Sequence, residues 1–318
     1  MGPRRMGKTS VLLQLPRLLG SEFLPAFVDM QAMQVRESLF AFFQAITESA
    51  SAALRRQGID APPLTRDELS ESPFSVFAQW LERLEAILES ERQLLLCLDE
   101  FERLEASIRE GRLPKEIMDQ LRHIIQHHPR VVVLVSGSHR PDAMELNWPD
   151  VLISTRLVEV SYLEEEDARQ LITRPVPKFP LTYTGESVTQ ILRTTRCQPY
   201  LVQAVCYELV NLLNVEGLRE ATPRHVSEAA QQALDSTRLY FAEMWRQLTD
   251  GQRRLLQAIA ARPEATPEPE LRALLAAEPG SLEAELRTLS LRRVLEESDG
   301  RWRFQVPMVA EWVRTRAG

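Results

Sequence analysis

Three short apolar segments, separated by helical patterns, dominate the first half of the 318-residue chain. The segments cover 26–31, 94–98 and 131–139, each ends in polar residues, and a weaker fourth segment covers 156–163. Strands that are apolar throughout are buried on both faces, and such strands alternate with helices in parallel sheets. The sequence therefore predicts an α/β fold, with a parallel sheet that carries helices on both faces.

After residue 163 the pattern becomes mainly helical. A Pro-rich connector, TRPVPKFPLTY, comes first, and a group of helical segments follows it. Thr249 and Gln252 have the spacing of a capping box in front of further helices, and Asp299-Gly300 predicts a β-hairpin after them. Helices followed by such a hairpin are typical of a winged helix. The expected divisions are a core over 1–163, a helical lid domain over 164–244 and a C-terminal winged-helix domain over 245–318.

The first residues of the chain match a phosphate-binding loop. The stretch Gly2-Pro3-Arg4-Arg5-Met6-Gly7-Lys8-Thr9 has the pattern G-x-x-x-x-G-K-[ST] and leads through Ser10 into a predicted helix. In such a loop, backbone N–H groups and the helix N-terminus surround a phosphate. Lys8 is expected to reach the β- and γ-phosphates, and Thr9 is expected to offer its hydroxyl to Mg²⁺. A basic, Gly-containing tail is the alternative, so the prediction needs a second motif.

That second motif is a pair of carboxylates at the end of a buried strand. Asp99 and Glu100 follow the segment LLLCL, as in a Walker B element. Asp99 is expected to hold Mg²⁺ through water, and Glu100 to polarise the attacking water as a general base. Ser136 ends the next apolar strand and is expected to contact the γ-phosphate or the water, although a strand can also simply end in serine. Both motifs together indicate a P-loop NTPase sheet with ATP and Mg²⁺ as cofactors.

The composition favours some partners over others. Lys and Arg number 38 against 45 Asp and Glu, which gives a formal net charge of −7, the wrong sign for a protein wrapped around a polyanion. The cysteines Cys97, Cys197 and Cys206 have no C-x-x-C spacing, which argues against a disulfide framework or a zinc site. The sequence contains no apolar stretch long enough to cross a bilayer. We expect a cytoplasmic protein without a membrane partner.

At these motifs the chain resembles the STAND-type signalling ATPases of the AAA+ superfamily, especially the group close to the archaeal ATPases. The resemblance rests on GPRRMGKTS, LLLCLDEFERLE, VSGS and CQPYLVQAVCYELV (197–210), and it extends over nearly the whole chain. It implies that Pro199 lies against the base or ribose of the nucleotide and couples the lid to the bound nucleotide. Arg196-Cys197 stand where the family usually has glycines.

The resemblance implies an ATP-dependent molecular switch that binds ATP or ADP and turns over slowly. Its expected partners are proteins that contact the winged helix or the lid, together with a nucleotide-dependent homo-oligomer. Arg140, Arg156 and Arg174 follow the sheet strands, and none of them is assigned as an arginine finger. The alternatives are a DNA-binding, origin-recognition-like ATPase and a non-hydrolysing scaffold. Nucleic acid is the less favoured partner, because basic and acidic residues nearly balance from 245 onward.

The start of the sequence raises a separate expectation. In this superfamily the strand before the phosphate loop is central in the sheet, and here only Met1 precedes Gly2. A gap at that place would leave two neighbouring strands with unpaired backbone groups. We therefore expect that Met1 is not the natural beginning and that an upstream segment supplies the strand.

Overall fold

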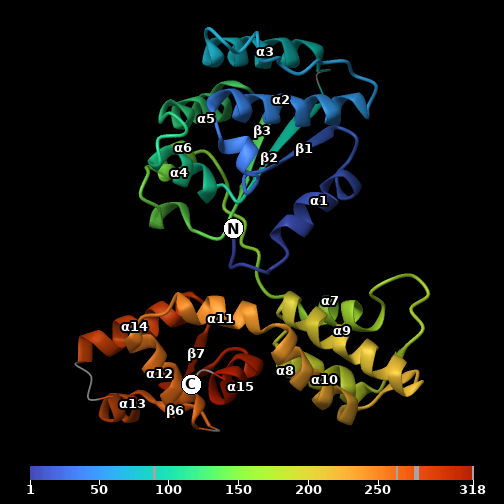
Figure 1. Ribbon diagram of the computed structural model, residues 1–318, viewed down its shortest axis with the longest axis vertical. Helices are drawn as coiled ribbons and strands as arrows, with labels where there is room; N and C mark the ends of the chain where they lie inside the picture. Colours follow the sequence, from blue (N-terminus) through green and yellow to red (C-terminus); the bar gives the residue numbers. More distant parts are fainter. Residues whose placement is uncertain (89–90, 263, 276–278, 317–318) are drawn as a thin grey trace. The chain divides into compact units, whose positions relative to one another are not determined.

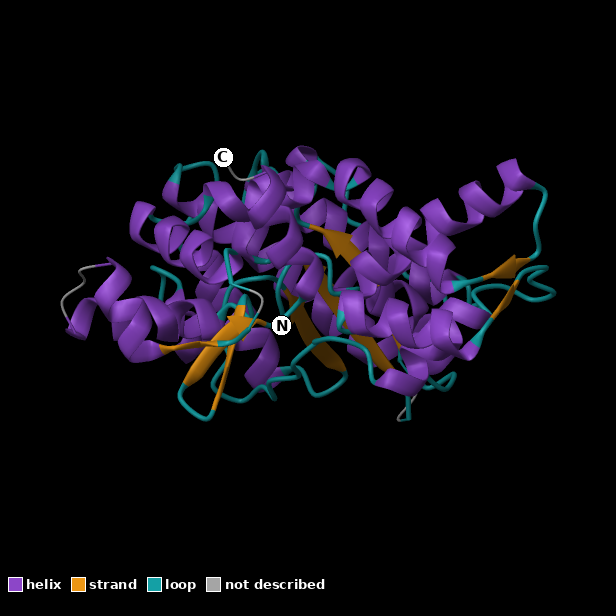
Figure 2. Ribbon diagram, turned by 90° about the horizontal axis from the view of Figure 1, so that it is seen from below, coloured by secondary structure: helices purple, strands orange, loops and turns teal. Residues whose placement is uncertain are grey.

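A computed structural model describes residues 1–318 except 89–90, 263, 276–278 and 317–318 (Figure 1). Contacts divide the chain into two compact units, Met1–Val160 and Ser161–Gly318, and each is described here by itself. Helices are the commonest regular element in both units, and the strands form short separate groups (Figure 2). Within the described ranges, no helix is both long and apolar enough to cross a membrane.

The sheet of the first unit is parallel, as the apolar segments predict. Strands β1 (Phe23–Asp29), β2 (Gln93–Asp99) and β3 (Val131–Ser136) pair in the order β1-β2-β3. The register places Asp29 opposite Asp99 and Asp99 opposite Ser136. The polar ends of all these strands therefore meet at one edge of the sheet.

Segment 156–163 was expected to be a fourth strand, and this expectation is wrong. The segment has no regular secondary structure, and its backbone is hydrogen-bonded to Met1 and, through the Leu163 amide, to the carbonyl of Cys197 at 3.0 Å. The amide of Val160 donates to the carbonyl of Met1 at 2.7 Å, and the Met1 amino group donates to the carbonyl of Val158 at 2.7 Å. A strand needs a run of ladder hydrogen bonds to a neighbour, and isolated contacts with Met1 and Cys197 do not provide one.

Helices cover the two faces of the sheet, as expected for the α/β class. Leu94, Leu96 and Leu98 of β2 face a large core, whereas Leu95 and Cys97 face a small cluster with α1, which is the alternation of a strand. The helices of this unit are α1 (Lys8–Leu18), α2 (Leu39–Arg55), α3 (Pro73–Ile87), α4 (Glu102–Arg109), α5 (Glu116–His127) and α6 (Trp148–Val151), with 3-10 turns η1 (Met33–Arg36) and η2 (Pro141–Ala143).

Helix α4 is attached to the segment that follows β3 by a buried acid. Glu105 accepts hydrogen bonds from the amides of Glu145 (3.0 Å) and Leu146 (3.4 Å) and from Nε1 of Trp148 (2.7 Å). The Trp148 ring is fully buried and packs edge-on against Phe101, with 4.9 Å between ring centroids. These contacts hold the segment 145–148 against α4.

The second unit begins with a helical group. It comprises α7 (Glu165–Thr173), α8 (Gly185–Thr195), α9 (Pro199–Glu216), α10 (Pro223–Ser236) and α11 (Arg238–Arg246), with the short parallel pair β4 (Thr182–Tyr183) and β5 (Glu220–Ala221). The predicted winged helix follows. It consists of α12 (Asp250–Ala260), β6 (Thr266–Pro267), α13 (Glu268–Leu275), α14 (Pro279–Leu291), β7 (Leu295–Ser298), β8 (Arg301–Phe304) and α15 (Pro307–Arg316). The hairpin β7–β8 turns at Asp299-Gly300, and β6 completes the small sheet beside β8.

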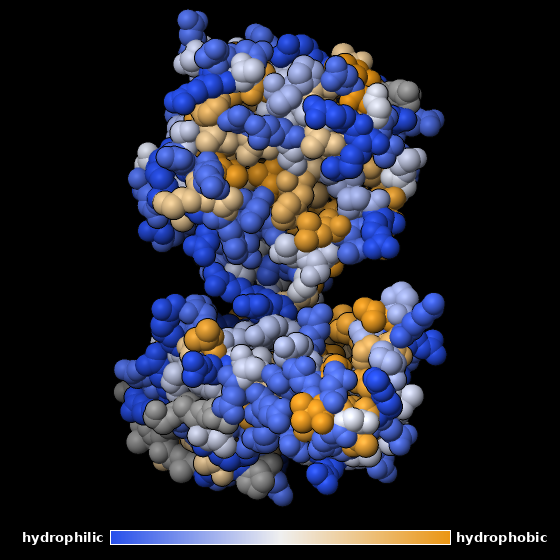
Figure 3. Space-filling model, turned by 45° about the vertical axis from the view of Figure 1, so that its right-hand side comes forward, coloured by the Kyte–Doolittle hydropathy of each residue, from blue (hydrophilic) through white to orange (hydrophobic). Residues whose placement is uncertain are grey.

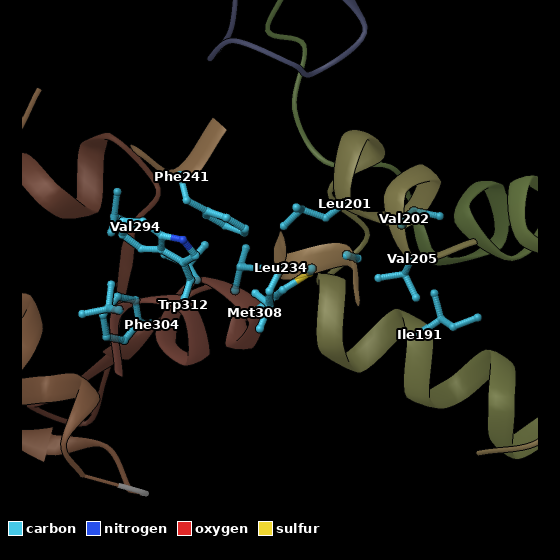
Figure 4. Packing of buried hydrophobic residues seen from close by; sticks show 14 of the residues in the cluster. Ile191, Leu201, Val202, Val205, Leu234, Phe241, Val294, Phe304, Met308 and Trp312 are labelled. Atoms are coloured by element: carbon cyan, nitrogen blue, oxygen red, sulfur yellow. The ribbon is translucent and has the colours of Figure 1, made fainter. Parts of the chain in front are cut away.

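One apolar core connects the helical group with the winged helix (Figure 4). Phe241 of α11 stacks on Trp312 of α15 with ring centroids 5.5 Å apart, and Leu201 and Leu234 belong to the same cluster. The segments 164–244 and 245–318 therefore form one compact unit, and the division at 244/245 remains a prediction. Outside the core, apolar side chains lie in separate small patches between polar ones on the face shown in Figure 3.

Candidate nucleotide-binding site

The predicted phosphate loop folds back on itself at the start of α1. Gly7 is the N-cap residue, with φ of 87°, a conformation that glycine adopts without steric cost. Lys8 begins the helix and is 7% exposed. Its Nζ donates to the carbonyl oxygens of Gly2 (2.8 Å) and Pro3 (2.9 Å), so the lysine closes the loop.

Two neighbouring segments fix the beginning of the loop. The Gly2 amide donates to the carbonyl of Gly137, just after β3, at 3.3 Å. On its other side Met1 pairs with Val158 and Val160 as described above. Met1-Gly2 thus lie between the end of β3 and segment 158–160, and the loop starts at the edge of the sheet that carries the polar residues.

The structure brings the two expected metal-binding residues together. The Thr9 hydroxyl donates to Oδ2 of Asp99 at 2.6 Å, across 90 positions of sequence. Asp99 is 2% exposed, and its other oxygen, Oδ1, is buried without a hydrogen-bond partner in the part of the chain that the structure describes. A buried carboxylate oxygen is costly unless something binds it, and carboxylate and hydroxyl oxygens are suitable ligands for Mg²⁺.

Glu100 and Ser136 lie at the same edge with unsatisfied polar atoms. Among the described residues, neither Oε2 of Glu100 nor Oγ of Ser136 has a hydrogen-bond partner, and both atoms are buried. Burial and the neighbouring Glu102 raise the pKa of Glu100. Its backbone has φ of 54°, a region that residues other than glycine rarely adopt and that is found at functional sites.

The sequence analysis missed Glu102, which belongs to the same cluster. Its carboxylate accepts hydrogen bonds from the amide (3.0 Å) and hydroxyl (2.5 Å) of Ser138, and Nδ1 of His139 lies 3.5 Å away. Burial alone would raise the pKa of Glu102, but His139 and Ser138 lower it to about 2. Gly137 leaves the room for this contact, because a Cβ atom there would lie 2.1 Å from Oε2 of Glu102. The signal in the sequence was the acidic spacing D-E-F-E beside the polar S-G-S-H.

Charged side chains surround Lys8 at this site. Desolvation lowers the pKa of Lys8, while Glu100, Glu102 and Asp99 act in the opposite direction. Arg4, the Met1 amino group and His139 also lie in this neighbourhood, so the site holds charges of both signs. The unpartnered carboxylate oxygen and the Thr9 hydroxyl fit Mg²⁺.

The remaining predicted residues are distributed over both units. Met6 is buried, Pro3 is half-buried, and Arg4, Arg5 and Ser10 are exposed. Pro199 belongs to the second unit, at the first turn of α9, and its contact with a nucleotide remains a prediction.

Two residues just before α9 have a backbone conformation that glycine favours. Arg196 and Cys197 have φ of 50° and 60°, the left-handed region in which glycine is favoured. The chain therefore keeps the turn between α8 and α9 although it lacks the glycines. The side chain of Gln198 caps α9 by accepting from the Leu201 amide at 2.6 Å.

No family model and no curated protein matches the chain. Among solved structures, the Walker-type ATPase PABY2304 of Pyrococcus abyssi aligns with a TM-score of 0.65 and 16% identity, over 98% of this chain and 89% of that chain. The ORC2 protein of Aeropyrum pernix aligns with a TM-score of 0.47 and 13% identity, over 99% of this chain and 86% of that chain. Of these two, the first has a TM-score above 0.5, and at 16% identity it shows a shared fold. The chain therefore shares the fold of that Walker-type ATPase, with a parallel sheet followed by helical and winged-helix segments.

Proposed function

We propose that the protein binds ATP with Mg²⁺ and hydrolyses it as a molecular switch of the STAND type. One observation carries the proposal. Thr9 is hydrogen-bonded to Asp99 at the sheet edge, and buried oxygens of Asp99, Glu100 and Ser136 lie there without partners in the described part of the chain. Burying unpaired polar groups costs free energy, so their gathering beside Lys8 is best explained by a ligand that binds them.

Each side chain has a defined task in this proposal. The backbone N–H groups of residues 2–9 surround the β-phosphate, and Lys8 exchanges its two carbonyl acceptors for phosphate oxygens. Thr9 and Asp99 hold Mg²⁺, which neutralises phosphate charge when it is bound. Glu100 accepts a proton from the attacking water, and Ser136 donates its hydroxyl to the γ-phosphate.

The switch acts through the second unit. Since the helical group and the winged helix share one core, we propose that they respond to the nucleotide as one body, with Pro199 as the contact to the base or ribose. We propose slow turnover, because a switch needs long-lived states.

We propose proteins rather than DNA as the partners of the winged helix and the lid, and a homo-oligomer in the nucleotide-bound state. The arginines of the wing make contacts within the unit. Arg303 pairs with Glu296 at 2.7 Å, and the guanidinium groups of Arg301 and Arg292 donate to the backbone carbonyls of Ala265 and Gln247. Groups that are already hydrogen-bonded offer less to a phosphate backbone.

Single-turnover hydrolysis tests the proposal. Wild type, Glu100→Gln and a matched control, Glu116→Gln at the exposed start of α5, are mixed with a limiting amount of ATP and Mg²⁺. A general base contributes about 10²–10⁴-fold, so Glu100→Gln should bind ATP and lose at least about a hundredfold in rate, while the control keeps it. Equal rates in wild type and Glu100→Gln would end the claim of hydrolysis. ATP binding without measurable hydrolysis in wild type would leave the scaffold alternative.

A further inference from the structure

Arg36, on η1 after β1, is a buried cation that has no ion pair with an acid among the described residues. The residue is 8% exposed. Its Nη1 donates to the Ser107 hydroxyl at 3.0 Å and its Nη2 to the Gln31 carbonyl at 3.2 Å, while Nε is buried and unpartnered in the described ranges. Buried charges in proteins are normally paired, so Arg36 departs from the usual pattern.

A second guanidinium group converges on the same hydroxyl. Nη2 of Arg112 donates to Oγ of Ser107 at 3.2 Å, and its Nε also lacks a partner among the residues described. Arg103, on α4, is exposed and lies close enough to act on Arg36. Burial, followed by the charges of Arg112 and Arg103, lowers the pKa of Arg36. Two guanidinium groups thus meet at one buried serine, and Arg103 adds a third positive charge near Arg36.

The acidic side chains nearby do not neutralise the positive charge of these arginines. Glu110 forms an ion pair with Arg112 and is about half exposed. Asp29 also acts on Arg36, but its Oδ1 already accepts from the amide of Gln31 at 2.8 Å. Like charges held together in a partly buried place are unfavourable unless an anion is bound between them.

We propose that Arg36 and Arg112, with the charge of Arg103 nearby, bind a tetrahedral oxyanion of the phosphate class, at a place separate from the Lys8 loop. The planar guanidinium fork suits the oxygens of phosphate, and the unpartnered Nε atoms of Arg36 and Arg112 supply the free donors. Ser107 and Arg103 belong to α4, which begins after Glu100. A bound oxyanion therefore ties η1 to that helix. The site is independent of the proposed hydrolysis.

Inorganic phosphate is the probe. The thermal unfolding midpoint is followed as phosphate is added, with chloride at equal ionic strength as the reference. Lys8→Ala serves as the parent protein, so that the loop does not contribute, and the titration is repeated with Lys8 present. Arg36→Met and Arg112→Met are compared in each background with Arg109→Met, a matched α4 variant whose arginine is exposed and pairs with Glu145.

The order of stability between Arg36→Met and its parent should reverse when phosphate is added. Without oxyanion, Arg36→Met should unfold at the same temperature as its parent or higher, because an unpaired buried charge is gone. In phosphate the parent should be the more stable, with the apparent phosphate affinity at least tenfold weaker in Arg36→Met and Arg112→Met and unchanged in Arg109→Met. Equal midpoints in phosphate and chloride would overturn the proposal. So would a large loss of stability of Arg36→Met in both salts, which would make Arg36 purely structural.

Discussion

Glu100 is held in a backbone conformation that its side chain disfavours, and glycine at this position should stabilise the protein. A φ of 54° costs an L-amino acid roughly 1–2 kcal/mol. Glycine avoids this cost but loses about 0.5–1 kcal/mol through its greater freedom in the unfolded chain. Removing the carboxylate also ends its repulsion with Glu102 and Asp99. We expect Glu100→Gly to raise the free energy of unfolding by about 1 kcal/mol.

Two further variants separate the effect of backbone strain on stability from the effect of the carboxylate charge. Glu100→Ala removes the carboxylate and keeps the strain, whereas Glu100→Gln keeps the size and removes the charge. At the midpoints of these two ranges, glycine should be more stable than alanine by about 0.8 kcal/mol, although at an ordinary helix position alanine is the more stable. Urea unfolding gives the total, and amide hydrogen exchange of β2 reports on the first unit alone.

The outcome bears on function as well as on stability. All three variants should lose hydrolysis, so Glu100→Gly would be more stable and inactive, the relation expected where strain is retained for a task. If alanine proved equal to glycine or more stable, the left-handed conformation would carry no strain. The argument that Glu100 is held in place for catalysis would then fail.

Other predictions concern both units. Trp312→Ala should destabilise the second unit by about 3–5 kcal/mol, and amide exchange should rise in both α9 and α12 because they share a core; a rise in α12 alone would refute the common core. The hydrogen bond to Glu102 raises the pKa of His139, so its stabilisation is complete below about pH 6.5 and is lost as the pH rises through the folded value. An NMR titration should show a lower pKa for His139 in Glu102→Gln, and an unchanged value would contradict the contact. A DNA mobility shift at physiological salt would overturn our preference for protein partners, since we expect none.

Local patterns predicted most of the fold. The apolar segments 26–31, 94–98 and 131–139 contain or overlap the three strands, because a buried parallel strand is recognisable from its own residues. Segment 156–163 shows the limit of this approach. Whether an apolar segment becomes a strand depends on a neighbour to pair with, and that neighbour is distant in sequence.

Part of the candidate site could also be predicted from the sequence, and part could not. The motifs predicted Thr9 and Asp99, and the structure places them 2.6 Å apart. Glu102 and Arg36 belong to no motif that the sequence displays. Their importance comes from Ser138 and Ser107, which lie 36 and 71 positions away along the chain. Such long-range contacts of single polar side chains leave no periodic pattern in the sequence.

The two buried acids of α4 have a mechanical consequence. Glu102 holds Ser138, and Glu105 holds the backbone at 145–146 and the indole of Trp148. Helix α4 and the segment after β3 are therefore hydrogen-bonded to each other at two places. Glu100 lies just before α4, and Ser136 lies just before the segment that follows β3. A displacement that begins at either residue must be shared by both, and the effects of changing them should not add.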